Sequence, residues 1–165
     1  MDRPGVQSRT MNSTDPLLIV AHTPSPNLQA MASALHQGAV AAADALPCKV
    51  IAPLQAQADD LLPAGGVVLL TPENLGYMSG AMKDFFDRSY YSLLDHTDAL
   101  PYALVIRAGT DGTGTRRALE SICGGLKWKP VQAPLVCRGE WQEEFLDQCR
   151  ELGETLVAGL EAGMF

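Results

Sequence analysis

Three short stretches of the sequence concentrate the residue types that hold a ligand through hydroxyls and backbone amides. The first is His22-Thr23-Pro24-Ser25-Pro26-Asn27, in which two hydroxyls and a side-chain amide stand at the start of an expected helix. A helix N-terminus favours a phosphate dianion because its free N–H groups and its dipole both point toward the ligand. Leu28 and Gln29 could add backbone amides, and His22 could add positive charge. The stretch therefore predicts a phosphate-binding loop.

Proline limits this first loop as an anion site. Pro24 and Pro26 have no N–H to donate, so the loop offers fewer amides than its length suggests. Proline also restricts the loop before a ligand arrives, which lowers the entropy cost of binding. A working phosphate loop and one that has lost its ligand both remain open.

The second stretch, Thr71-Pro72-Glu73-Asn74-Leu75-Gly76-Tyr77-Met78, joins the apolar run Val67–Leu70 to an amphipathic helix that opens near Ser79. We expect a flexible bend with exposed amides there. The third stretch is Ala108-Gly109-Thr110-Asp111-Gly112-Thr113-Gly114. Its glycines allow backbone amides to approach a planar ring closely. Its glycine spacing and its place after a fourth strand do not match the dinucleotide fingerprint.

The elements around these stretches alternate between strand and helix. Strands are expected at 16–21, 49–52, 67–70, 102–106 and 131–137. Helices are expected from Pro26, around 59–62, from Ser79, after Thr115 and from Trp141. This alternation predicts an α/β fold of three layers, with helices on both faces of a doubly wound, five-stranded parallel sheet. Pro53 and Pro134 make the second and fifth strands edges, which favours the strand order 2-1-3-4-5 and brings the three stretches to one crevice.

Seven residues around the second stretch carry a family resemblance. They have the spacing P-x-x-x-G-x-M-x-x-x-M-K-x-F-x-D and are Pro72, Gly76, Met78, Met82, Lys83, Phe85 and Asp87. The pattern resembles the flavodoxin-like flavoproteins, particularly the NAD(P)H-dependent FMN reductases and the quinone reductases of the tryptophan-repressor-binding type. This resemblance implies the same strand order and FMN as cofactor.

The resemblance also implies which residues bind the cofactor. Phosphate contacts fall on the first loop, at His22, Thr23, Ser25, Asn27 and Leu28. Ring contacts fall on the other two, at Pro72, Glu73, Asn74, Leu75, Gly76, Tyr77, Met78, Gly109, Thr110 and Asp111. No catalytic side chain is expected, because the flavin carries the chemistry.

The implied function is electron transfer from NADH or NADPH to a small-molecule acceptor such as free flavin or a quinone. Two alternatives are a flavodoxin-type one-electron carrier and a flavodoxin-like domain that has lost flavin binding. Arg107, Arg116 and Arg117 surround the third stretch, and one of them could favour NADPH by binding its 2′-phosphate. The simpler interpretation is that Arg116 and Arg117 only solvate the start of a helix.

Composition limits the partners. The formal net charge of −7 disfavours nucleic acid and anionic lipid, and no apolar run approaches the ~20 residues that span a bilayer. We expect one cytoplasmic domain over residues 16–165, with residues 1–15 as a flexible tail that does not resemble a secretory signal. The resemblance suggests a homodimer or homotetramer.

Neither the cysteines nor the histidines are spaced as a metal site. Cys48, Cys123, Cys137 and Cys149 include no C-x-x-C pair and are expected to be reduced, mostly buried thiols. The three histidines are scattered along the chain.

Overall fold

The computed structural model describes residues 12–165. The strands are β1 (Leu17–Ala21), β2 (Cys48–Ile51), β3 (Gly66–Asn74), β4 (Tyr77–Met78), β5 (Pro101–Ala108), β6 (Lys129–Pro130) and β7 (Leu135–Arg138). The helices are α1 (Pro26–Ala42), α2 (Ala58–Leu61), α3 (Gly80–Leu93), α4 (Thr113–Gly125) and α5 (Glu144–Glu161). The expected tail lies largely outside the described residues, and the described part, Asn12–Asp15, forms a turn in which the Asp15 N–H donates to the Asn12 carbonyl.

The sheet has the order β2-β1-β3-β5-β6, with β7 also paired to β5. All of these pairings are parallel. Numbered by their place in the parallel sheet, the strands follow 2-1-3-4-5, so the predicted topology is confirmed. The three central strands are almost wholly buried, which explains their continuous apolar sequences.

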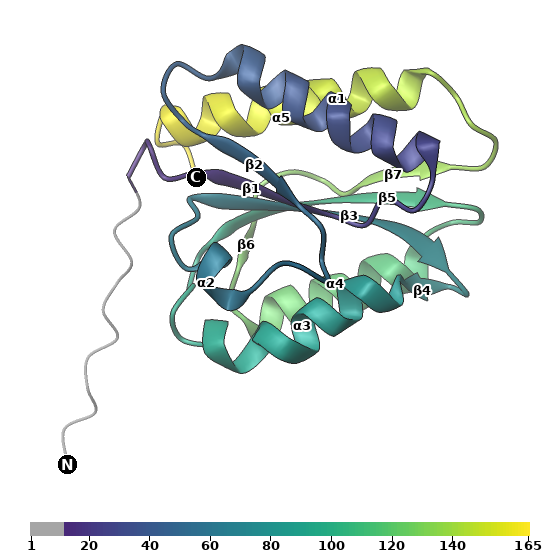
Figure 1. The fold of residues 1–165 in the computed structure, drawn as a ribbon, viewed down its shortest axis with the longest axis horizontal. Coiled ribbons are helices and arrows are strands. Elements are labelled where there is room, and N and C mark those ends of the chain that lie inside the picture. The colour runs from purple at the N-terminus through teal and green to yellow at the C-terminus, as the bar shows by residue number, and fades with distance from the viewer. Residues whose placement is uncertain (1–11) are drawn as a thin grey trace.

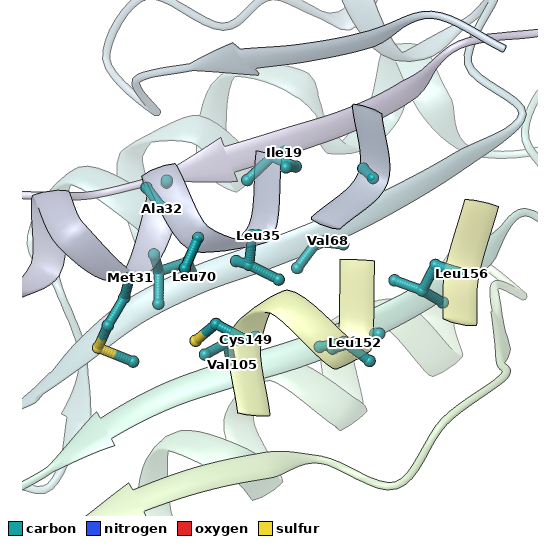
Figure 2. Close-up of a cluster of buried hydrophobic side chains, with 14 of the residues drawn as sticks. Ile19, Met31, Ala32, Leu35, Val68, Leu70, Val105, Cys149, Leu152 and Leu156 are labelled. Atoms are coloured by element: carbon teal, nitrogen blue, oxygen red, sulfur yellow. The ribbon is translucent and has the colours of Figure 1, made fainter. Parts of the chain in front are cut away.

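Helices cover both faces of the sheet (Figure 1). Helices α1 and α5 lie together on one face, and α2, α3 and α4 lie on the other. Figure 2 shows the first core, where Leu35 from α1 and Leu152 from α5 meet Val68 and Val105 from the sheet. The second core contains Phe85 and other apolar residues of α3, as the spacing of three and four predicts.

The fifth strand differs from the prediction of one segment over 131–137. Two short strands replace it: β6 pairs with β5 at Tyr102↔Pro130 and β7 resumes at Val105↔Leu135. Pro130 and Leu135 are five residues apart, whereas their partners on β5, Tyr102 and Val105, are only three residues apart. The residues between β6 and β7 therefore cannot all pair with β5. Pro134 falls inside this bulge, where its missing N–H costs no sheet hydrogen bond.

The helix starts follow local capping signals. The Ser25 hydroxyl accepts from the Leu28 N–H at 3.2 Å, with Pro26 at the first helical position, and the Ser79 hydroxyl accepts from the Met82 N–H at 3.2 Å. Both caps confirm the predicted boundaries.

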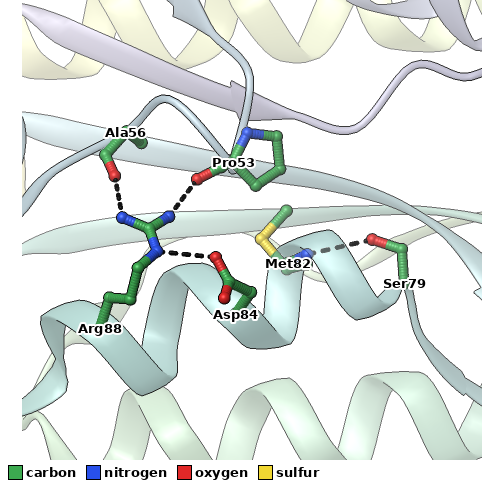
Figure 3. A network of polar contacts seen from close by, with 6 residues as sticks. All are labelled: Pro53, Ala56, Ser79, Met82, Asp84 and Arg88. Carbon is green, nitrogen blue, oxygen red and sulfur yellow. Dashed lines mark hydrogen bonds and ion pairs between the residues drawn. The ribbon is translucent and has the colours of Figure 1, made fainter.

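Arg88 ties α3 to the segment that follows β2. Its guanidinium donates to the carbonyls of Ala56 at 2.9 Å and Pro53 at 2.7 Å, and to the Asp84 carboxylate at 2.7 Å (Figure 3). This contact orients the helix that follows the second stretch. None of the helices in residues 12–165 combines the length and the apolar character that a membrane crossing requires.

Candidate functional site

The three predicted stretches meet at the carboxyl edge of the sheet. The first stretch is tied to β3, because the His22 N–H donates to the Leu70 carbonyl at 3.0 Å. The second and third are tied to each other by Glu73, whose Oε1 accepts from the Thr110 N–H at 3.1 Å and from its hydroxyl at 2.7 Å. In Figure 1 the start of α1, the end of β4 and the start of α4 all lie at this edge. Open α/β sheets bind ligands here, between the strands at which their order reverses.

The first loop offers a small set of donors at the start of α1. The backbone N–H groups of Thr23, Ser25 and Asn27 have no acceptor within residues 12–165. The Ser25 oxygen caps the helix, so its hydrogen remains available to an outside acceptor. These groups fit a phosphate, which needs several converging donors and gains from the helix dipole.

Two expected donors are missing from this loop. The Leu28 N–H is bonded to the Ser25 hydroxyl and the Gln29 N–H to the Ser25 carbonyl, so both amides already have an acceptor within the protein. The reason is the N-cap itself, which uses the same amides. Burial lowers the pKa of His22, which favours the neutral imidazole over the charged form that could have assisted phosphate binding.

The second stretch is a β-hairpin and not the unpaired bend that was expected. Strand β3 continues to Asn74, and β4 pairs back with it at Glu73↔Met78 and Asn74↔Tyr77. The connecting residues have φ +52° at Leu75 and φ +74° at Gly76, as the two-residue hairpin turn that suits sheet twist requires. The usual signal, Asn-Gly, is obscured because leucine stands between Asn74 and Gly76.

The hairpin divides its residues between the core and the surface. Pro72 and Met78 are buried, so their side chains belong to the core and leave only backbone for a ligand. The outward group contains Asn74, Leu75, Gly76 and Tyr77, and Leu75 is completely exposed. At the hairpin, the predicted ring contacts are therefore limited to the backbone and to the side chains of its exposed residues.

Thr71, which the sequence analysis did not single out, fixes the base of the hairpin. Its buried hydroxyl donates to the Pro72 carbonyl at 2.9 Å and accepts from the Ser79 N–H at 3.0 Å. The sequence does not indicate this role of Thr71, because the Ser79 N–H that donates to it is eight residues away in the chain.

The third loop is shorter than predicted, since α4 already begins at Thr113. The Asp111 carboxylate accepts from the Thr113 N–H at 3.0 Å, and this hydrogen bond holds the pKa of Asp111 below its usual value. A Cβ placed on Gly109 would meet nothing within 4 Å, so the loop leaves open space beside its backbone. Gly114 touches the hairpin: a Cβ there would lie 2.1 Å from the Gly76 carbonyl oxygen.

Of the three arginines that could bind a 2′-phosphate, Arg107 is already bonded within the protein. Its guanidinium donates to the carbonyls of Cys137 at 3.0 Å and Gly139 at 2.6 Å, and lies over the rings of Trp141 and Phe145. Arg107 therefore joins β5 to the connection between β7 and α5. Arg116 and Arg117 remain at the start of α4, where Arg116 pairs with Glu120 at 3.0 Å.

Comparison with solved structures identifies the fold. A flavodoxin from the domain Archaea aligns with a TM-score of 0.76 at 17% identity, over 88% of this chain and 99% of that chain. The flavodoxin, WrbA-like protein from Agrobacterium tumefaciens aligns with a TM-score of 0.68 at 14% identity, over 90% and 98%. The chain has the flavodoxin-like fold. An oxidoreductase from Corynebacterium diphtheriae shares it, with a TM-score of 0.64 at 16% identity over 92% of this chain and 97% of that chain.

No family model and no curated protein sequence matches the chain. The similarity of this chain to flavodoxin-like proteins is therefore shown by its fold. The four cysteines are free thiols, three of them buried, and no group of three metal-ligating side chains gathers within residues 12–165.

Proposed function

We propose that this flavodoxin-like protein binds FMN and transfers electrons from NADH or NADPH to a small acceptor such as free flavin or a quinone. The observation that carries the proposal is the meeting of three unlike loops at one edge of the sheet. One has unpaired N–H groups at a helix start, one is a hairpin with exposed backbone, and one has open space beside a glycine. The fold of a flavodoxin and the motif shared with FMN and quinone reductases support the same ligand.

The residues present fit the two ends of FMN. The N–H groups of Thr23, Ser25 and Asn27 would hold the phosphate, supported by the dipole of α1. The hairpin residues 73–77 and the third loop, Gly109–Gly112, would flank the ring. When bound, FMN supplies the hydride and electron chemistry, and the protein supplies binding, orientation and electrostatics.

Three groups of this chain set the environment of the ring. Glu73 places a carboxylate against Thr110, and the Thr113 N–H stabilises the ionised form of Asp111. Negative charge near the ring disfavours adding an electron to it, so these carboxylates lower the potential at which a bound flavin is reduced. Tyr77, 40% exposed at the end of the hairpin, presents an aromatic face to the same edge.

The first experiment is the absorbance spectrum of the purified full-length protein. Flavin bands that remain after gel filtration, with FMN released on denaturation, support the proposal. A colourless protein that also fails to bind added FMN would show that the pocket has lost its ligand.

The second experiment separates a reductase from a one-electron carrier, which the similarity to a flavodoxin keeps as an alternative. We expect anaerobic NADH or NADPH to bleach the bound flavin in one two-electron step and a quinone to restore its colour. A stabilised one-electron form under photoreduction, with no reaction toward either nicotinamide, would assign the protein as a carrier.

A further inference from the structure

A cavity of about 340 Å³ lies next to the third loop, between the first two turns of α4 and the end of β7. Its charged lining residues are Asp111, Arg116, Arg117, Glu120 and Arg138. Three arginines thus gather around one hollow in a chain with a net charge of −7. Arg138 enters this group only through the fold, because it is the last residue of β7, whereas Arg116 and Arg117 lie in α4, which follows β5.

Two of these arginines have unused binding capacity. Arg116 is paired with Glu120 at 3.0 Å, but within residues 12–165 the guanidinium groups of Arg117 and Arg138 have no hydrogen bond and no ion pair. Arg138 acts on Asp111 only through its charge, which adds to the hydrogen bond from Thr113 in lowering the pKa of that carboxyl. The arginines elsewhere differ. Arg107 is bonded to backbone carbonyls and Arg150 to the Asp147 carboxylate at 3.1 Å.

Arg116 and Arg117 lie in the first two turns of α4, where their positive charges oppose the helix dipole. The Asp111 carboxylate, which accepts from the Thr113 N–H, offsets part of this positive potential. An anion between Arg117 and Arg138 would be attracted by both side chains and by the dipole. Guanidinium groups bind phosphate through two parallel hydrogen bonds, which a lysine cannot reproduce.

The remaining lining residues favour a sugar phosphate over a bare ion. Asp111 and Glu120 bring carboxylate oxygens to the same cavity, where they can accept from a hydroxyl but repel a free anion. Asp111 also belongs to the third loop, so the cavity borders the proposed flavin site. A ligand that reaches from that site into the cavity would place its own phosphate between the arginines.

We propose that this cavity binds the 2′-phosphate of NADPH and makes NADPH the preferred electron donor. This inference rests on the proposed function for the identity of the donor. The recognition chemistry is a phosphate monoester beside a ribose hydroxyl, held by Arg117 and Arg138.

The test is calorimetric titration of the full-length protein with adenosine 2′,5′-bisphosphate and with 5′-AMP, which differ only in the 2′-phosphate. We expect the bisphosphate to bind at least about tenfold more tightly, as charge-assisted bidentate contacts allow. Arg117→Gln and Arg138→Gln should each remove most of that difference and leave 5′-AMP binding unchanged. Arg117→Lys should restore part of it, and Arg150→Gln, in α5 on the opposite face of the sheet, should have no effect.

Equal affinity for the two nucleotides would overturn the proposal, as would variants that weaken both ligands alike. Inorganic phosphate is titrated as well: if it binds as tightly as the bisphosphate and depends on the same arginines, the cavity is a site for free phosphate and not for the donor. Thermal melting verifies that each variant is folded. None of these titrations needs bound flavin, so a failure of the proposed FMN function leaves this result readable.

Discussion

The carboxylate of Glu73 accepts two hydrogen bonds from Thr110, one from its backbone N–H and one from its hydroxyl, at 3.1 and 2.7 Å. Glu73 belongs to the hairpin and Thr110 to the loop that precedes α4, and 36 residues separate them in the chain. One side chain therefore sets the distance between the two segments that would flank a flavin ring.

Glu73→Ala should loosen the third loop. Hydrogen bonds of this kind contribute about 1 kcal/mol each when partly exposed, so we expect faster amide hydrogen exchange over 109–112 and a several-fold weaker affinity for FMN. Glu73→Gln keeps an acceptor oxygen and should retain most of the affinity while raising the flavin potential. Unchanged exchange in Glu73→Ala would contradict the clamp, and an unchanged potential in Glu73→Gln would contradict the electrostatic role.

Ser25→Ala should reduce both stability and ligand binding. The cap from the Ser25 hydroxyl to the Leu28 N–H is lost, at a cost of about 1 kcal/mol in the free energy of unfolding. The donor for a phosphate is lost too, so FMN should bind more weakly. Ser25→Thr retains both groups and serves as the control in urea unfolding and FMN titration. Equal FMN affinity in Ser25→Ala and the native protein would remove the phosphate role and leave only the cap.

Gly76→Val should damage the site and leave the fold intact. A Cβ at Gly76 meets no atom within 4 Å, so the cost comes from the backbone, whose φ of +74° is unfavourable for a β-branched residue by about 2 kcal/mol. We expect a lost or weakened FMN affinity, or a shifted potential, with the far-ultraviolet circular dichroism unchanged. Gly76→Asn, which tolerates this φ, is the matched control, and a normal affinity and potential in Gly76→Val would argue against a backbone role.

Leu75→Asn should stabilise the protein. Leu75 has φ +52° and its side chain is fully exposed, so replacing it loses no packing and relieves about 1 kcal/mol of backbone strain. Leu75→Ala keeps the strain and should show no such gain in the unfolding free energy. If both variants unfold at the same urea concentration as the native protein, the turn is not strained at this residue.

Acid should weaken the attachment of α5. The Glu161 carboxylate accepts from the N–H groups of Asp44 at 2.9 Å and Leu46 at 3.1 Å, and these hydrogen bonds, with that from Leu46 largest, hold the pKa of Glu161 below its usual value. A lowered pKa means that the stabilisation is present above the unfolded-state pKa and is lost as the pH falls through the folded-state pKa.

Glu161→Gln should therefore be less stable than the native protein at pH 7, and the difference should shrink as the pH falls below about 4.5. Glu154→Gln, at an exposed position of the same helix, is the control and should change little. Unfolding curves at several pH values provide the measurement. A Glu161→Gln deficit that persists undiminished at low pH would show that the carboxylate charge is not what holds the loop.

Local physics explains what was predictable from the sequence. Buried parallel strands appear as continuous apolar runs, and Ser25 and Ser79 mark helix starts because a cap acts within three residues. The strand order followed from edge-like prolines, and the convergence of the three stretches followed from that order. These features need only a residue and its near neighbours, together with the rules of sheet topology.

The tertiary structure decided which groups at the site are free and which are already used. Arg107 binds carbonyls beyond β7, Glu73 reaches Thr110, and Arg138 joins Arg117 around one cavity, all through contacts between residues far apart in the chain. The hairpin also escaped prediction, since Leu75 adopts a conformation that its own side chain disfavours and that the pairing of β3 with β4 imposes. Residue type determines which groups a side chain can bind. Only the packed fold determines whether that side chain is already bonded to another group of the protein.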